Sequence, residues 1–140
     1  MRIYLGFFCL VLLLTACLND KQQHTFKEYK WKAGEQVNLA FSADKTQKVF
    51  FEIRSYYGFP ISEIPMKFEL KDESNKKINF SKNISFREEN LDCTGDFCDQ
   101  RMCIIQMDTV NSEGDFKLKI SKGFENLTYL GLMEMRVVIE

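Results

Sequence analysis

The sequence predicts an all-β protein, an antiparallel β-sandwich of jelly-roll-like form with about eight strands. Three observations lead to this class. Apolar and polar residues alternate with period two through most of the chain, helical periodicity is scarce, and clusters of turn-forming residues separate the alternating runs. A strand with one apolar face needs a second sheet to cover that face, so two sheets packed face to face are expected.

Each expected strand places apolar side chains at every second position. In chain order these side chains are Val37, Leu39 and Phe41; Val49, Phe51 and Ile53; Met66, Phe68 and Leu70; Ile78 and Phe80; Ile84 and Phe86; Cys103, Ile105 and Met107; Phe116, Leu118 and Ile120; and Met133, Met135, Val137 and Ile139. The pairs at 78–80 and 84–86 predict two short pieces. Turn signals lie at 33–35, 42–44, 72–75 and 111–114, and 123–127 is the one candidate helical turn.

The first 16 residues have the composition of a secretory signal peptide. Arg2 supplies a positive charge, residues 3–14 are apolar, and Leu14-Thr15-Ala16-Cys17 forms a lipobox. The apolar stretch is shorter than the roughly 20 residues needed to cross a bilayer core. We therefore expect cleavage before Cys17, acylation of Cys17, and attachment to a membrane through the acyl chains. An ordinary signal peptide with an incidental cysteine is the alternative.

The chain thus divides into a signal peptide (1–16), a lipidated tether (17–25) and a β-sandwich domain (26–140). Removing 16 of the 140 residues leaves 124, which is enough for one domain. The tether is polar and aperiodic. It contains the only histidine, His24, which we expect to be solvated and inert.

The charge balance excludes some partners. The whole chain has 19 basic and 20 acidic residues, and loss of the signal peptide removes only Arg2. Nucleic-acid binding needs a concentrated basic face, so we expect no nucleic-acid partner. The same balance gives no polybasic attraction to anionic lipid, so membrane attachment is expected to depend on the acyl chains.

Residues that would carry catalysis are missing from the expected domain. A serine or cysteine nucleophile needs a positioned base, and the only histidine lies in the tether. Acidic residues are numerous, but they occupy turns or the outward phase of strands, which is typical of a solvated face. Glycine-rich phosphate loops are absent. We therefore expect no enzyme activity, no catalytic residue and no cofactor.

The cysteines at 93, 98 and 103 form the most distinctive cluster. A secreted chain meets an oxidising environment in which disulfides persist. Cys103 shares its phase with Ile105 and Met107, so we expect it in the core as a small apolar side chain. Cys93 and Cys98 flank a turn-like stretch that brings them within bonding reach, which favours a Cys93–Cys98 disulfide. Other pairings and free thiols remain alternatives.

Metal binding at the same segment is the less favoured interpretation. Three thiolates without a neighbouring histidine fall short of the four ligands of a structural zinc site. Asp92, Asp96 and Asp99 are interleaved with the cysteines, but they lack the spacing of an EF-hand loop. A solvated acidic loop explains these aspartates better, and we expect no metal.

Tyr56, Tyr57 and Phe59 surround a glycine and precede a proline at the end of an expected strand. Tyrosine offers a large contact area at low entropic cost, so these aromatics are candidates for contact with a partner. Aromatic side chains at such a position also plug the end of a sandwich. The sequence favours the plug and leaves partner binding open.

Several stretches resemble the gliding-motility-associated lipoproteins of the GldH type, found in the Bacteroidota. The resemblance begins with the lipobox at Cys17 and continues through Trp31, which an expected strand follows. It then covers residues 53–64, 114–120 and 130–140, and the last two stretches are the most similar. The chain departs from the family pattern at Met135, where a glycine is common, and in the cysteine-bearing segment.

The resemblance implies an envelope lipoprotein of β-sandwich form that is accessory to a gliding or secretion apparatus, and it brings no catalytic residues. Our leading hypothesis is a non-enzymatic lipoprotein that binds another envelope protein. The alternative is a ligand-binding or inhibitor lipoprotein that presents the aromatic loop or a sandwich cleft to a glycan, a lipid or a foreign protein. Leu18 follows the lipidated cysteine in place of an aspartate, so we expect the outer membrane, with the domain facing the periplasm.

Overall fold

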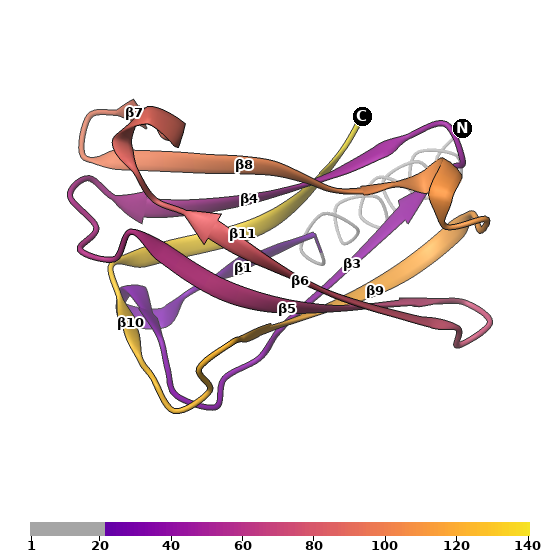
Figure 1. Ribbon diagram of the computed structural model, residues 1–140, viewed down its shortest axis with the longest axis horizontal. Helices are drawn as coiled ribbons and strands as arrows, with labels where there is room; N and C mark the ends of the chain where they lie inside the picture. Colours follow the sequence, from indigo (N-terminus) through magenta and orange to yellow (C-terminus); the bar gives the residue numbers. More distant parts are fainter. Residues whose placement is uncertain (1–21) are drawn as a thin grey trace, which may run out of the picture.

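The computed structural model describes residues 22–140, and the signal peptide, Cys17 and the start of the tether lie outside the described residues. The described chain is a sandwich of antiparallel strands (Figure 1), which confirms the predicted fold class. No helix in residues 22–140 is long and apolar enough to span a membrane.

One layer is a five-stranded sheet with the strand order β1-β11-β4-β8-β7. Its strands are β1 (Gln23–Thr25), β4 (Lys48–Tyr56), β7 (Asp92–Thr94), β8 (Phe97–Gln106) and β11 (Leu132–Ile139). The other layer is a four-stranded sheet with the order β3-β9-β5-β6, in which the strands are β3 (Val37–Ala43), β5 (Glu63–Asp72), β6 (Lys77–Ser85) and β9 (Gly114–Lys122).

Short elements close the sandwich. β2 (Lys30–Trp31) and β10 (Tyr129–Leu130) pair as a two-stranded ribbon. Three 3-10 turns complete the described chain: η2 (Lys27–Tyr29), η3 (Glu88–Asn90) and η4 (Met107–Thr109). The turns at 44–47 and 107–113 and the β5–β6 hairpin lie at one end, while η2 and the β4–β5 and β7–β8 connections lie at the other (Figure 1).

The core lies between the two sheets and is rich in phenylalanine. Phe51 of the five-stranded sheet meets Phe68 of the four-stranded sheet edge to face, with ring centroids 5.5 Å apart. Phe68 also stacks on Phe80 at 5.1 Å, and Phe41 stacks on Phe116 at 5.4 Å. Aromatic pairs of this kind contribute about 0.5–1.5 kcal/mol beyond the burial of their area. The period-two pattern of the sequence therefore predicted the core face of these strands correctly.

The prediction that Cys103 lies in the core is wrong. The pairing of β4 with β8 shifts register between Val49 and Phe50, so both Ile104 and Ile105 are buried and the strand changes phase there. Cys103 is exposed opposite Phe50, and it is the free cysteine of the described chain. A bulge reverses the inward and outward positions of a strand, which strict alternation does not anticipate.

Other local expectations also change. The two short pieces expected around residues 78–86 form the single strand β6, which pairs with β5 over its whole length. Residues 123–127 make a bend and a turn, not a helical turn. Gln23–Thr25, expected in the tether, pairs with β11 as an edge strand. His24 in that strand is about 30% exposed; it lies 3.7 Å from the Glu35 carboxylate.

Candidate functional site

Exposed aromatic side chains gather at the end of the sandwich where β4 ends. Tyr57 is 62% exposed, Tyr29 is 44% exposed and Phe97 is 39% exposed, and half-buried Tyr56 lies among them. We call these four residues the aromatic patch. They come from three separate parts of the chain: η2, the end of β4 with its following turn, and the start of β8.

Tyr56 is the centre of the patch. Its ring meets Tyr29 edge to face at 5.1 Å and Phe97 at 5.4 Å, measured between ring centroids. A hydrogen bond with the Tyr29 side chain, with smaller effects of burial and of the Asp96 charge, raises the pKa of Tyr56. A tyrosine is neutral at physiological pH, so Tyr56 adds no charge to the patch, and its hydroxyl is engaged with Tyr29.

Backbone hydrogen bonds hold the patch together. The Tyr56 amide donates to the Gly131 carbonyl (3.0 Å), and the Gly131 amide donates to the Tyr29 carbonyl (2.9 Å). Gly131 has a φ of +95°, and a Cβ there would lie 3.3 Å from the Phe59 ring. Glycine alone adopts such a backbone without strain. Position 131, just before β11, therefore favours glycine. Through its two hydrogen bonds Gly131 holds Tyr29 next to Tyr56.

A disulfide fixes the other side of the patch. The Cys93 and Cys98 sulfurs are bonded at 2.01 Å, which confirms the predicted pairing. The two cysteines face each other in the β7–β8 register. The turn between them leads into Phe97, the first residue of β8, and the Asp96 carbonyl in the turn accepts a hydrogen bond from the Tyr57 amide (2.8 Å). The disulfide thereby fixes the β7–β8 hairpin, and the Tyr57–Asp96 hydrogen bond joins this hairpin to the end of β4.

The three aromatic residues singled out from the sequence have different surroundings. Phe59 packs against the core, with its ring 4.7 Å from that of Phe86, and so acts as the expected plug. Tyr57 is the most exposed member of the aromatic patch. Tyr56 is half-buried and contacts both Tyr29 and Phe97. Sequence reasoning missed Tyr29 and Phe97. Phe97 had a signal, because it lies in the turn between the paired cysteines, whereas nothing near Tyr29 pointed to this end.

A buried lysine supports the segment that carries Tyr29. Lys122 is 1% exposed and donates hydrogen bonds to the carbonyls of Trp31 (3.3 Å), Lys32 and Leu127 (2.7 Å). Its ammonium also lies 5.1 Å from the Trp31 ring centroid. Burial lowers the pKa of Lys122, and the Glu35 charge opposes this. The ammonium thus fixes the chain just after η2.

The charged residues beside the patch are engaged with one another. Arg54 donates two hydrogen bonds to Asp99, at 2.7 and 2.9 Å, and lies 3.6 Å from Glu134. The hydrogen bonds to Asp99 raise the pKa of Arg54. In residues 22–140 no group of three or more histidine, cysteine, aspartate or glutamate side chains is placed to hold a metal ion.

Comparisons with known proteins give no family: no family model and no curated protein matches this chain. Among solved structures, the chain is similar to a structure of CBM4. The two share 8% sequence identity, the match covers 84% of this chain and 68% of the CBM4 chain, and the TM-score is 0.41. The mannan-recognising carbohydrate-binding module TmCBM27 gives 12% identity, 84% and 70% coverage, and a TM-score of 0.44.

A structure of cocksfoot mottle virus is similar at 4% identity, over 84% of this chain and 90% of that chain, with a TM-score of 0.35. Likenesses this distant say nothing of what this protein binds. The functional argument therefore depends on the residues of this chain alone.

Proposed function

We propose that this protein is a lipid-anchored, non-enzymatic lipoprotein of the bacterial cell envelope, and that its aromatic patch binds another envelope protein. The observation that carries the proposal is the exposed aromatic patch, which rigid strands, a disulfide and a buried lysine hold in place. Tyrosine and other aromatic side chains dominate the energetics of protein interfaces because they bury a large area with few rotatable bonds.

The path of the chain supports this arrangement. The Gln22 carbonyl accepts a hydrogen bond from the Val137 amide (2.9 Å), and the Phe26 amide donates to the Met133 carbonyl (2.8 Å). The described chain thus runs along β11 toward η2 and the aromatic patch. An acyl anchor on Cys17 would lie five residues before Gln22, a reach of at most about 17–18 Å.

Gln22 lies about half-way along the sandwich, because Val137, whose amide bonds the Gln22 carbonyl, pairs with Phe51 of β4. From Phe51 to Tyr56 the strand covers about 17 Å at the usual rise of a strand. The described chain runs from this level toward the patch. The end of the sandwich with Tyr57 outermost would meet a partner in the periplasm.

The GldH-type resemblance supports a more specific role, accessory to a gliding or secretion assembly. Leu18 after the expected lipidated cysteine, in place of an aspartate, favours the outer membrane. The domain would then face the periplasm, tethered where its partner is assembled.

Affinity purification of the lipidated protein from its native envelope tests the proposal. We expect one envelope protein to copurify with the wild type and to be lost from the Tyr29→Ala/Tyr57→Ala variant. The matched control is Phe124→Ala, because Phe124 is 57% exposed and lies outside the patch. Both variants should remain folded, but the double variant should melt a few degrees lower, because Tyr29→Ala removes the edge-to-face contact with Tyr56, worth about 0.5–1.5 kcal/mol.

Retention of the partner by the double variant would contradict the proposal, as would equal loss from the control. The ligand-binding alternative has its own outcome: an envelope glycan or lipid would raise the melting temperature of the wild type but not of the double variant.

A further inference from the structure

The strand β6 forms an open edge of the four-stranded sheet. It is the last strand in the order β3-β9-β5-β6, so among the described strands β5 alone pairs with it. The pairing is regular from Lys77 to Ser85, which lie opposite Lys71 and Glu63, and no bulge interrupts it. Most residues of β6 are exposed or half-buried. A long, regular and exposed edge presents free backbone groups that can pair with another strand.

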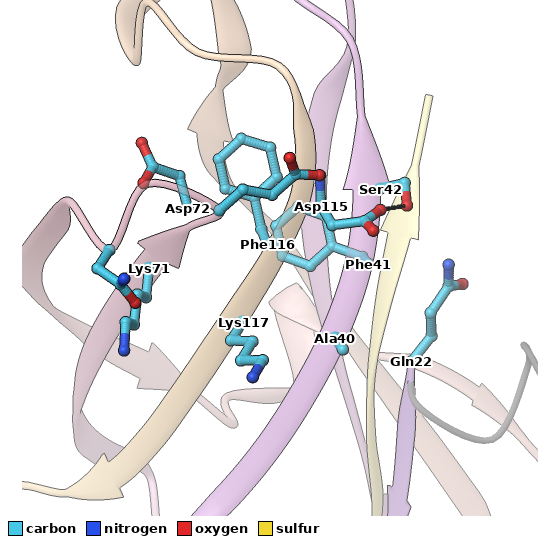
Figure 2. A pocket seen from close by; sticks show the side chains of 11 residues that line it. Gln22, Ala40, Phe41, Ser42, Lys71, Asp72, Asp115, Phe116 and Lys117 are labelled. Atoms are coloured by element: carbon cyan, nitrogen blue, oxygen red, sulfur yellow. Dashed lines mark hydrogen bonds between the residues drawn. The ribbon is translucent and has the colours of Figure 1, made fainter.

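The opposite edge of the same sheet is flanked by the chain itself. Gln22, the residue before β1, lines a hollow of about 550 Å³ together with Ala40 and Ser42 of the edge strand β3 (Figure 2). The Ser42 hydroxyl donates a hydrogen bond to the Asp115 carboxylate of β9, as Figure 2 also shows. The four-stranded sheet therefore has one flanked edge, at β3, and one open edge, at β6.

Hydrogen bonds just beyond both ends of β6 show which of its backbone groups face the open edge. The Phe86 amide donates to the Ser62 carbonyl (2.7 Å), and the Asp72 amide donates to the Lys76 carbonyl (3.1 Å). Bonded and non-bonded positions alternate along an antiparallel pair. The even-numbered residues of β6 therefore direct their N–H and C=O groups to β5, and the odd-numbered residues direct theirs to the open edge.

The sequence of β6 reads nearly the same in both directions about Ser81. Residues 78–84 are Ile-Asn-Phe-Ser-Lys-Asn-Ile, so isoleucine and asparagine recur at equal distances on either side of the serine. Two copies of β6 paired antiparallel about Ser81 would place Ile78 of one copy opposite Ile84 of the other, and the asparagines likewise. Every odd position then meets an odd position, so the free backbone groups of the two copies face each other. The nine-residue strand would give about ten backbone hydrogen bonds in this register, two for each pair of odd positions.

We infer that β6 is a dimerisation edge, on which a second copy of this chain pairs antiparallel about Ser81 and joins the two four-stranded sheets into one. In this register Phe80 of each copy lies opposite Lys82 of the other, where an ammonium and a ring can make a cation–π contact. Ile78 and Phe80 are half-buried against the core, and the added strand would cover part of their remaining apolar surface.

The lysines of β6 select this register and disfavour others. Lys82 has the inward phase of an edge strand, a placement that commonly prevents pairing with a foreign strand. About Ser81, Lys82 meets Phe80 and Lys77 meets Ser85, so no like charges lie directly opposite each other. A two-residue slip in one direction would set the two Lys82 side chains opposite each other, which destabilises a strand pair. The same strand therefore fits a second copy of itself better than an arbitrary strand.

The size of the interface sets where the dimer forms. A strand pair of nine residues is smaller than a standard protein interface, so the dimer is weak in dilute solution. The expected lipid anchor confines the copies to one membrane and raises their effective concentration. The two-fold axis reverses the strand direction, so the two aromatic patches lie at opposite ends of the dimer and both stay open.

Disulfide crosslinking of the full lipidated chain in its native membranes tests the inference, in a Cys103→Ser background that removes the exposed free thiol. Ser81→Cys should form a covalent homodimer under mild oxidation, because the two Cα atoms of a directly opposed pair lie about 5.5 Å apart, within disulfide reach. Asn79→Cys is the matched control on the same strand. The two copies of residue 79 would lie four positions apart along the strands, about 13 Å, which is beyond disulfide reach. We expect at least about tenfold more covalent dimer from Ser81→Cys than from Asn79→Cys.

Two further variants check the register. Asn79→Cys/Asn83→Cys should regain the crosslink, because residue 79 of one copy then meets residue 83 of the other. Adding Ser81→Pro to this double variant should abolish the crosslink, since proline removes an N–H that faces the open edge. Proline is tolerated on edge strands, so the melting temperature of the dilute protein should stay within about 4 °C of the double variant.

Equal crosslinking of Ser81→Cys and Asn79→Cys, no homodimer from Ser81→Cys, or a crosslink from position 81 to a different protein would overturn the inference. The β6 edge is separate from the aromatic patch. The Tyr29→Ala/Tyr57→Ala substitutions should therefore leave the crosslink at position 81 unchanged, and failure of one proposal leaves the other intact.

Discussion

Replacing Lys122 by methionine removes a buried ammonium while keeping most of the side-chain volume. Three carbonyls, from Trp31, Lys32 and Leu127, lose their donor. A buried polar group without a partner costs about 1–3 kcal/mol. Lys32 and Leu127 are exposed residues whose carbonyls water can reach in part. Methionine also recovers some apolar burial, so the net loss of unfolding free energy should be about 3 kcal/mol.

The assay is thermal and urea unfolding of the purified protein. For a domain of this size the entropy of unfolding makes 1 kcal/mol worth about 4 °C, so the melting temperature should fall by roughly 10–12 °C. Trp31 is the one tryptophan of the chain and lies beside the ammonium. Its fluorescence should therefore shift to the red in the folded variant, as water reaches the segment after η2.

The control is Lys82→Met, because Lys82 is exposed on β6. Its stability should change by less than about 0.5 kcal/mol. A Lys122→Met variant that melts within about 3 °C of the wild type, with unchanged Trp31 emission, would refute the argument that this ammonium stabilises the fold through the three carbonyls.

Three further predictions concern the strands around the two sites. Replacing Cys93 and Cys98 by alanine opens a short loop and should lower the unfolding free energy by about 2 kcal/mol in the chain-entropy model; urea denaturation measures it, and an unchanged midpoint would count against the role of the disulfide. Within residues 22–140 of the native protein, a maleimide should label Cys103 alone, because that thiol is exposed; mass spectrometry that finds Cys103 unlabelled would indicate a core position. Lys71 lies opposite Lys77 on β6 and Lys117 on β9, so Lys71→Gln should raise stability by about 0.2–0.5 kcal/mol at low salt, with the gain fading at high salt; a loss of stability would contradict like-charge repulsion among these three lysines.

The strict alternation of apolar and polar residues was sufficient to predict most of the strands. Residues 37–43 and 114–122 formed strands where the pattern predicted them, because each has one apolar face over a whole strand. The bulge opposite Val49 could not be predicted, since Ile104 and Ile105 are both apolar and either phase fits the sequence. A local register shift depends on the partner strand, which a single chain segment does not specify.

The candidate site was predictable only where its members are close in sequence. Tyr56, Tyr57 and the disulfide partners are local signals. Tyr29 joins Tyr56 through the pairing of distant strands, so its place in the aromatic patch follows from topology. Lys71 and Lys117 likewise become neighbours only through the register of β5 with β9.

The central claim is that the aromatic end of the sandwich meets a protein partner. Photocrosslinking in living cells tests it most directly, with benzoylphenylalanine placed at position 57 in the aromatic patch or at position 45 in the turn at the opposite end of the sandwich. We predict a crosslink to one envelope protein from position 57 and none to that protein from position 45. A crosslink from position 45 alone, or no protein crosslink from position 57, would contradict the account.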